Sequence, residues 1–193
     1  MNFKSAFALV LLLETVAILL GVISHGWTLE GLQAVTRFSG RVSLGIFSII
    51  FLFYNHPAIN IRRVLSDKFF LAFAAAHGIH LFELLSYIYF ADSPIIWYRL
   101  AGGAAAYALI FAMPWVQERY ENGAMTGKRF NQVALIYLYY VWFIFFMTYL
   151  PRVRGTLPNA GGSYKEFVIL LGWVSIMMGF KWSQLLAKPG RRS

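Results

Sequence analysis

The sequence contains no cysteine, which excludes disulfide bonds, iron–sulfur clusters and thiolate metal ligands. Charged residues are scarce as well, because Asp, Glu, Lys and Arg supply only 13% of the 193 residues, against about 25% in soluble domains. This composition is not that of a soluble enzyme domain. Histidine, carboxylate, methionine and tyrosine are the side chains left for binding a metal or a cofactor.

The sequence is instead rich in long apolar stretches. Hydrophobic residues make up 59% of the chain and gather in six stretches, each close to the ~20 residues that a helix needs to cross a bilayer. The stretches are 5–24, 38–57, 69–90, 94–116, 130–150 and 167–185. Mostly short polar turns separate them, so the sequence predicts one all-α domain over residues 1–193, an integral membrane bundle of six transmembrane helices.

The basic residues predict the orientation of this bundle, because they fall unequally on its two sides. The richer side holds Lys4, Arg62, Arg63, Lys68, Arg119, Lys128, Arg129, Lys188, Arg191 and Arg192, and the poorer side holds Arg37, Arg41, Arg99, Arg152, Arg154 and Lys165. Both termini are therefore expected to be cytoplasmic, in a bacterial or organellar inner membrane. The net charge of +9 indicates contact with anionic membrane lipid rather than nucleic acid.

Four acidic or histidine residues lie deep inside the apolar stretches, away from their ends: Glu14, His77, His80 and Glu83. A charge at mid-membrane costs at least ~2.5 kcal/mol, so such residues are rare and informative. On the third predicted helix, His77, His80 and Glu83 are three residues apart and share one side of the helix. They could form a haem ligand, a metal site, a proton relay or a structural hydrogen bond between helices, and we expect Glu14 to hydrogen-bond to His77 or His80.

Three other ionisable residues lie toward the ends of the predicted helices. His25 and His56 fall at predicted membrane edges, where an amphipathic ring is common and needs no special role. Lys181 lies near the inner end of the sixth helix and is expected to extend its ammonium group to the headgroups. These residues are weaker candidates for a site than the four inside the stretches.

Several short motifs carry a family resemblance. They are Ser39-Gly40-Arg41 opening the second helix, Arg62-Arg63-Val64-Leu65 before the third, a histidine within the third, and Gly127-Lys128-Arg129-Phe130 opening the fifth. In this order, with six helices and inside termini, they resemble the ferric reductase-like transmembrane family. The haem-b membrane subunits of bacterial periplasmic methionine sulfoxide reductase systems are the most similar members. The resemblance covers roughly residues 37–150.

The resemblance implies electron transfer through haem b, from a quinone or a flavin reductase to an outer acceptor. His80 is then the preferred haem ligand and His77 the second, with Arg41 and Arg99 near the propionates. The two helix-five histidines of the family fall on Ala134 and Met147 in this chain, which leaves Met147 as a candidate axial ligand. Arg152 and Arg154 are candidates for docking a separate protein subunit through an acidic surface.

The leading hypothesis is therefore a membrane-embedded electron-transfer subunit of a redox complex. Two alternatives belong to other classes. One is a haem-free accessory or anchor subunit, which the missing helix-five histidines favour. The other is a small transporter or proton-conducting protein that uses Glu14, His77, His80 and Glu83, which the combination of carboxylates and histidines at mid-membrane favours.

Overall fold

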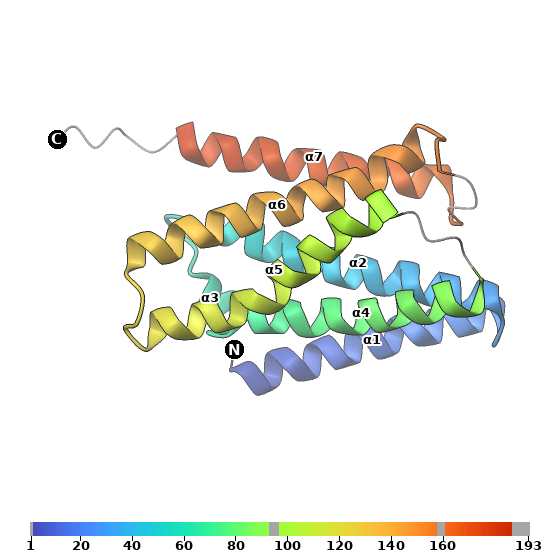
Figure 1. Cartoon of the computed structure of the whole chain (residues 1–193), viewed down its shortest axis with the longest axis horizontal. Helices are drawn as coiled ribbons and strands as arrows, with labels where there is room; N and C mark the ends of the chain where they lie inside the picture. Colours follow the sequence, from blue (N-terminus) through green and yellow to red (C-terminus); the bar gives the residue numbers. More distant parts are fainter. Residues whose placement is uncertain (1, 93–96, 158–160, 187–193) are drawn as a thin grey trace.

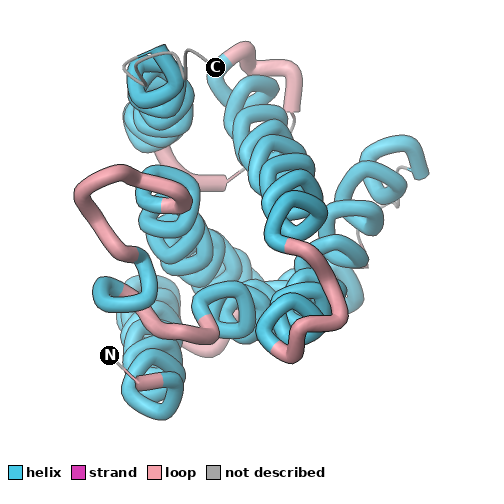
Figure 2. Tube along the Cα trace, turned by 90° about the vertical axis from the view of Figure 1, so that its left-hand side faces the viewer, coloured by secondary structure: helices cyan, strands magenta, loops and turns pink. Residues whose placement is uncertain are grey.

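The computed structural model describes residues 2–92, 97–157 and 161–186, and within them the chain is helical and free of strands. The helices are α1 (Phe3–His25), α2 (Leu29–Phe53), α3 (Ile61–Val64), α4 (Phe69–Phe90), α5 (Trp97–Glu121), α6 (Gly127–Val153) and α7 (Tyr164–Leu186). The six long helices lie side by side in a bundle (Figures 1 and 2), with α1 and α7 at opposite edges. The start of α1 and the end of α7 lie at the same end of this bundle (Figure 1).

Five of the described helices are long and apolar enough to cross a bilayer: α1, α2, α4, α6 and α7. Their outward faces carry large apolar side chains, as on α1, where Leu12 and Ile23 are exposed. Such faces are stable only against lipid, so the chain is a multi-pass membrane protein in contact with lipid. The sixth crossing by α5, the cytoplasmic location of the termini and the kind of membrane stay predictions.

Local sequence signals explain where several helices begin. Asn2 accepts a hydrogen bond from the backbone N–H of Ser5 at the start of α1, and Thr28 does the same for Gly31 at the start of α2. These side chains satisfy backbone donors that have no partner within the helix. Because Thr28 acts as the cap, α2 begins at Leu29 rather than at residue 38, where the apolar stretch begins. The beginning of the fourth apolar stretch, at residue 94, lies outside the described residues.

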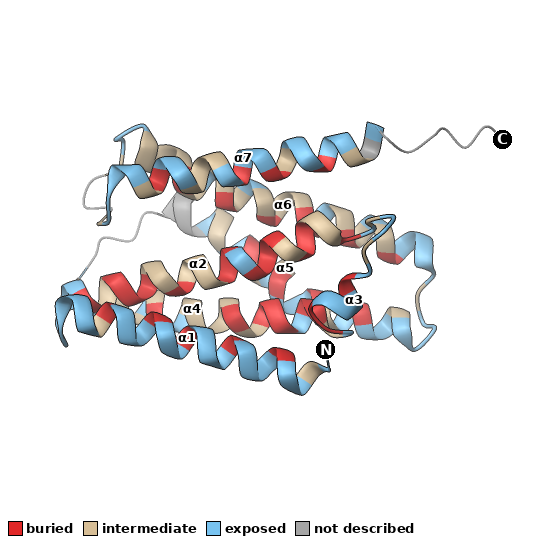
Figure 3. Ribbon diagram, turned by 180° about the vertical axis from the view of Figure 1, so that it is seen from behind, coloured by how far each residue is buried: buried red, intermediate tan, exposed pale blue. Residues whose placement is uncertain are grey.

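The core lies mainly between α2, α4 and α6, as the buried positions in Figure 3 show. Its largest enclosed side chains are aromatic, with Phe47, Phe51, Phe70 and Phe73 all at 0% exposure. Phe47 contacts both Phe73 on α4 and Phe145 on α6. This aromatic block fills the bundle toward the end that holds the α2–α3 loop.

Polar contacts close that same end of the bundle. Lys68 pairs with Glu121 at 2.7 Å and so joins the start of α4 to the end of α5; the hydrogen bond raises the pKa of Lys68. The hydroxyl of Ser66 donates to the neighbouring Asp67 at 2.9 Å and lowers the pKa of that carboxyl group.

Lys181 of α7 is buried, contrary to the expectation that it reaches the headgroups. Its ammonium group donates to the backbone carbonyl of Tyr54 at 2.7 Å. The last carbonyls of a helix attract a cation because they carry partial negative charge. Lys181 therefore binds α7 to the end of α2.

Candidate functional site

Glu14 lies on the one buried stripe of α1. This stripe consists of Ala6, Val10, Glu14, Ala17 and Gly21, whose spacing of three and four residues places them on one helix face. That face packs against α2 and α4. Glu14 is 2% exposed, so the helix turns its single carboxyl group away from lipid and into the bundle.

A second carboxyl group meets Glu14 from α4. Glu83 is 7% exposed and interacts electrostatically with Glu14. Ser39 of α2, fully buried, lies close enough to interact with both carboxyl groups. Yet neither the four carboxyl oxygens nor the Ser39 hydroxyl makes a hydrogen bond of regular geometry. Two acids that face each other without a cation in a membrane interior cannot both stay ionised, so the pair must hold at least one proton.

The two histidines continue this polar region along α4. The His80 ring lies beside Gly40 of α2: a Cβ atom added to Gly40 would be 3.1 Å from Cε1 of His80. The same ring also lies against the backbone carbonyl of Thr36. The His77 ring lies with its centroid 5.4 Å from that of His80 and stacks on Tyr107 of α5 at 4.8 Å. The Nδ1 atom of each ring is enclosed and has no hydrogen-bond partner.

The expected hydrogen bond from Glu14 to His77 or His80 is absent, so that prediction is wrong. A step of three residues turns a helix by about 300°, which leaves successive side chains about 60° apart. Glu83 accordingly faces Glu14, whereas His80 faces α2, and His77 faces Tyr107 of α5. The four residues lie in one region, but the two acids lie around Ser39, and neither of them makes a hydrogen bond to a ring.

The polar region ends at the aromatic block. Ser43, one helical turn beyond Ser39 on α2, is fully buried and its hydroxyl has no partner. Next on α2 and α4 come the buried rings of Phe47 and Phe73, 5.5 Å apart. The carboxyl groups are therefore closed off from the end that holds the α2–α3 loop.

The side chains on α6 do not suit a haem held between α4 and α6. Met147 is 42% exposed and lies on the outside of the bundle, whereas Ala134 lies inside and offers no ligand atom. The α6 ring nearest His77 is that of Phe145, at 6.0 Å. No group of three His, Asp or Glu side chains suited to a metal ion occurs in the described residues either. The residues present therefore do not fit a second axial ligand opposite His80.

The arginines expected at an outer surface fall into two groups. Arg37 and Arg41 lie within α2 rather than in a loop, because this helix begins at Leu29. Arg41 pairs with Glu166 of α7 at 2.9 Å, and Arg37 donates to Gln33 at 3.3 Å. The Arg41–Glu166 pair joins α2 to α7 at the end of the bundle opposite the α2–α3 loop, whereas the Arg37–Gln33 bond lies within α2.

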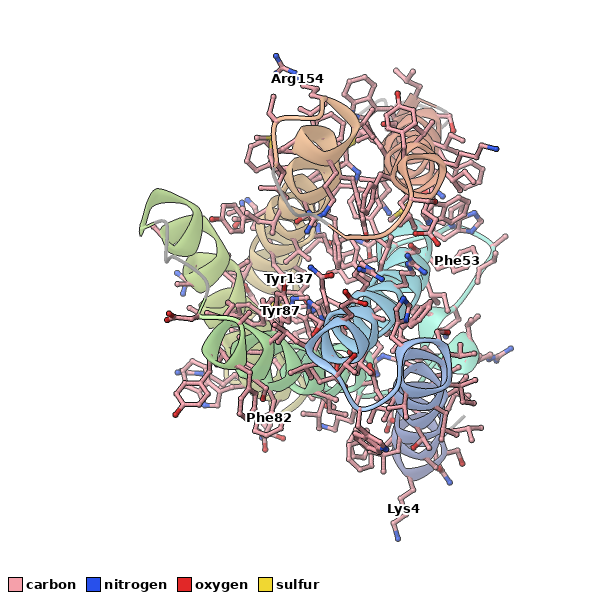
Figure 4. All side chains as sticks on the ribbon, turned by 90° about the vertical axis from the view of Figure 1, so that its right-hand side faces the viewer. Lys4, Phe53, Phe82, Tyr87, Tyr137 and Arg154 are labelled. Atoms are coloured by element: carbon pink, nitrogen blue, oxygen red, sulfur yellow. The ribbon has the colours of Figure 1, made fainter. Side chains whose placement is uncertain are left out.

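The two arginines proposed to dock a partner differ in their surroundings. Arg152 donates to the backbone carbonyl of Thr148 and lies over the Phe167 ring at 5.7 Å, so it serves contacts inside the chain. Arg154 is exposed and points away from the bundle (Figure 4). Partner docking through Arg154 stays a prediction, and the side chain of Arg99 lies outside the described residues.

Sequence reasoning missed the hydroxyl side chains of α2 that complete the site. Thr36, Ser39 and Ser43 are three and four residues apart, which places them on one helix face. That spacing in an otherwise apolar stretch was the available signal. No family model, no curated protein and no solved structure matches the chain, so the ferric reductase-like resemblance continues to depend on the motifs alone.

Proposed function

We propose that the chain is a proton-coupled membrane protein in which Glu14 and Glu83 take up and release protons. The observation that carries this proposal is the pair of buried carboxyl groups around Ser39, with all four oxygens unpartnered. An unpaired buried polar group destabilises a fold. Such a group is usually functional when it lies inside a membrane.

The surroundings of the pair support a coupled carrier rather than an open pore. His80 and Ser43 continue the row of polar side chains from the two acids toward the α2–α3 loop. The aromatic block of Phe47 and Phe73 then fills the bundle. A pore would need a continuous polar path to both ends. A site that opens to one end at a time can instead exchange a proton for another solute, because occupancy and access change together.

Infrared spectroscopy during a pH titration tests the proposal. Protonated carboxylic acids have a C=O stretching band that ionisation removes, and we expect the wild-type protein to lose such a band as the pH rises. Glu14→Gln and Glu83→Gln should each remove about half of it or more, since the two groups titrate together. Glu118→Gln, at an exposed position of α5, is the matched control and should leave it unchanged. Identical bands in all four proteins would overturn the proposal.

An electron-transfer subunit holding haem b is the second candidate. The observation in its favour is the partly buried His80 ring beside Gly40, which belongs to the Ser39-Gly40-Arg41 motif that carries the family resemblance. We expect the dithionite-reduced wild-type protein to show b-type haem absorbance on this hypothesis, with loss in His80→Ala and retention in His25→Ala. A protein that stays colourless with excess haem would eliminate it. If that colourless protein also lacked the titrating carboxyl band, the haem-free anchor subunit would remain.

A further inference from the structure

A groove adjoins the carboxyl pair at the end of the bundle that holds the α1–α2 turn. It has a volume of about 470 Å³ and lies between α1, α2 and α4, with an almost wholly apolar lining that includes Ile18, Val22 and Val35. Pockets for small molecules usually measure about 300–1,000 Å³. Two aromatic side chains that line it, Trp27 and Phe90, are 89% and 69% exposed, which places them at its rim.

Among the residues that the structure describes, Glu83 is the single carboxyl group that lines this groove. It lies seven residues before the end of α4, which corresponds to a depth of about 10 Å along the helix. Thr28 also lines the groove, but its hydroxyl already donates to the His25 carbonyl at 2.8 Å and accepts from the Gly31 N–H at 3.1 Å. A molecule in the groove would therefore meet apolar walls and the side chain of Glu83, whose two carboxyl oxygens are enclosed and make no hydrogen bond of regular geometry.

We propose that this groove binds a lipophilic amine in its protonated form, which enters from the lipid and pairs its ammonium group with Glu83 when that side chain turns its enclosed carboxyl group toward the groove. Charge complementarity selects this occupant, because a carboxylate in an apolar groove is stabilised by one cation and repels anions. The apolar body of the amine replaces lipid on Ile18 and Val22. Trp27 at the rim offers a ring face that attracts a cation.

The inference rests on the proposed function and names the substrate class of its site. When the protonated amine binds, the carboxylic acid of Glu83 loses its proton to water, and the ammonium–carboxylate pair takes the place of the O–H bond. Each amine that binds in its protonated form therefore releases one proton from Glu83. Protons and amines thus compete for the same carboxyl group, which is the requirement for coupled exchange.

Binding of imipramine, a tricyclic tertiary amine, to the full chain in lipid nanodiscs tests this inference, with empty nanodiscs as the partition blank. We expect saturable binding, release of about one proton per amine, and affinity that falls as the pH is lowered. Glu83→Gln should weaken binding at least tenfold. Glu30→Gln removes an exposed acid in the first turn of α2 and should change affinity less than twofold.

A second variant controls for the possibility that Glu83→Gln weakens binding by disturbing the fold. Ile18→Trp fills the groove from α1 and replaces neither carboxyl group, so it should weaken amine binding while the infrared carboxyl band is retained. Unchanged affinity in Glu83→Gln, or no saturable binding by the wild-type protein, would overturn the amine site even if the carboxyl band titrates. Amine binding without proton release and without a titrating band would instead overturn proton coupling and leave a simple amine-binding groove.

Discussion

Glu14→Met and Glu83→Met are each expected to stabilise the folded protein by about 1–3 kcal/mol while abolishing proton exchange. Both carboxyl groups are buried without hydrogen-bond partners. Their burial therefore lowers the stability of the folded protein. Methionine has a similar length and an adaptable apolar side chain. Gain of stability together with loss of activity is characteristic of a functional site.

Thermal unfolding of the purified proteins in one detergent measures this effect, and the infrared carboxyl band, of which each variant should lose about half or more, reports the loss of the titrating acid. Glu118→Met is the control, because Glu118 is an exposed residue of α5 and its replacement should change stability little. If the carboxyl groups instead act as structural hydrogen-bonding partners, both methionine variants should unfold at a lower temperature than the wild type. That result would contradict the proposed role of the pair.

Gly21→Ala is expected to destabilise the protein by about 1–3 kcal/mol, because it forces α1 away from α2. A Cβ atom at Gly21 would lie 2.4 Å from Cγ2 and 2.8 Å from the backbone nitrogen of Val35. A side chain can rotate away from such a clash, but the backbone of α2 cannot. The helices must therefore separate next to Glu14 and the groove, so amine binding should weaken as well.

Gly45→Ala provides the matched control for this prediction. Gly45 is also a helical glycine, but it has no heavy atom of the surroundings within 4 Å of its added Cβ. Alanine has a higher helix propensity, so this variant should be neutral or more stable by up to about 1 kcal/mol. Thermal unfolding of both variants measures the difference. Equal stability of Gly21→Ala and Gly45→Ala would show that the close approach of α1 to α2 is unimportant.

Much of the helical framework could be predicted from hydropathy, since each of the six apolar stretches overlaps a long helix. The stretch 69–90 coincides with α4, whereas α2 begins at Leu29, well before residue 38. Glu30, Gln33 and Arg37 lower the hydropathy of this first part. They are nevertheless compatible with a helix there, because Thr28 caps its first turn and Gln33 bonds to Tyr87 of α4 at 2.8 Å.

The sequence indicated which residues form the candidate site, but not which of them lie next to each other. The rarity of charge in a membrane interior pointed to Glu14, His77, His80 and Glu83. Sequence spacing could not show which of them meet, because this depends on the rotation of α1 and α4 against α2. The rotation of α6 within the bundle likewise places Met147 outside and Ala134 inside.

Hydropathy along the chain was enough to place this protein in a membrane and to show that its polar interior is small, because a bilayer admits only long apolar helices and few buried charges. Which polar side chains lie together in that interior depended on how the helices pack. The buried stripe of α1 places Glu14 beside Ser39 and Glu83, and the groove beside Glu83 is formed by residues that are distant in the sequence. Contacts between helices depend on side-chain packing in three dimensions, which no periodicity along one helix specifies.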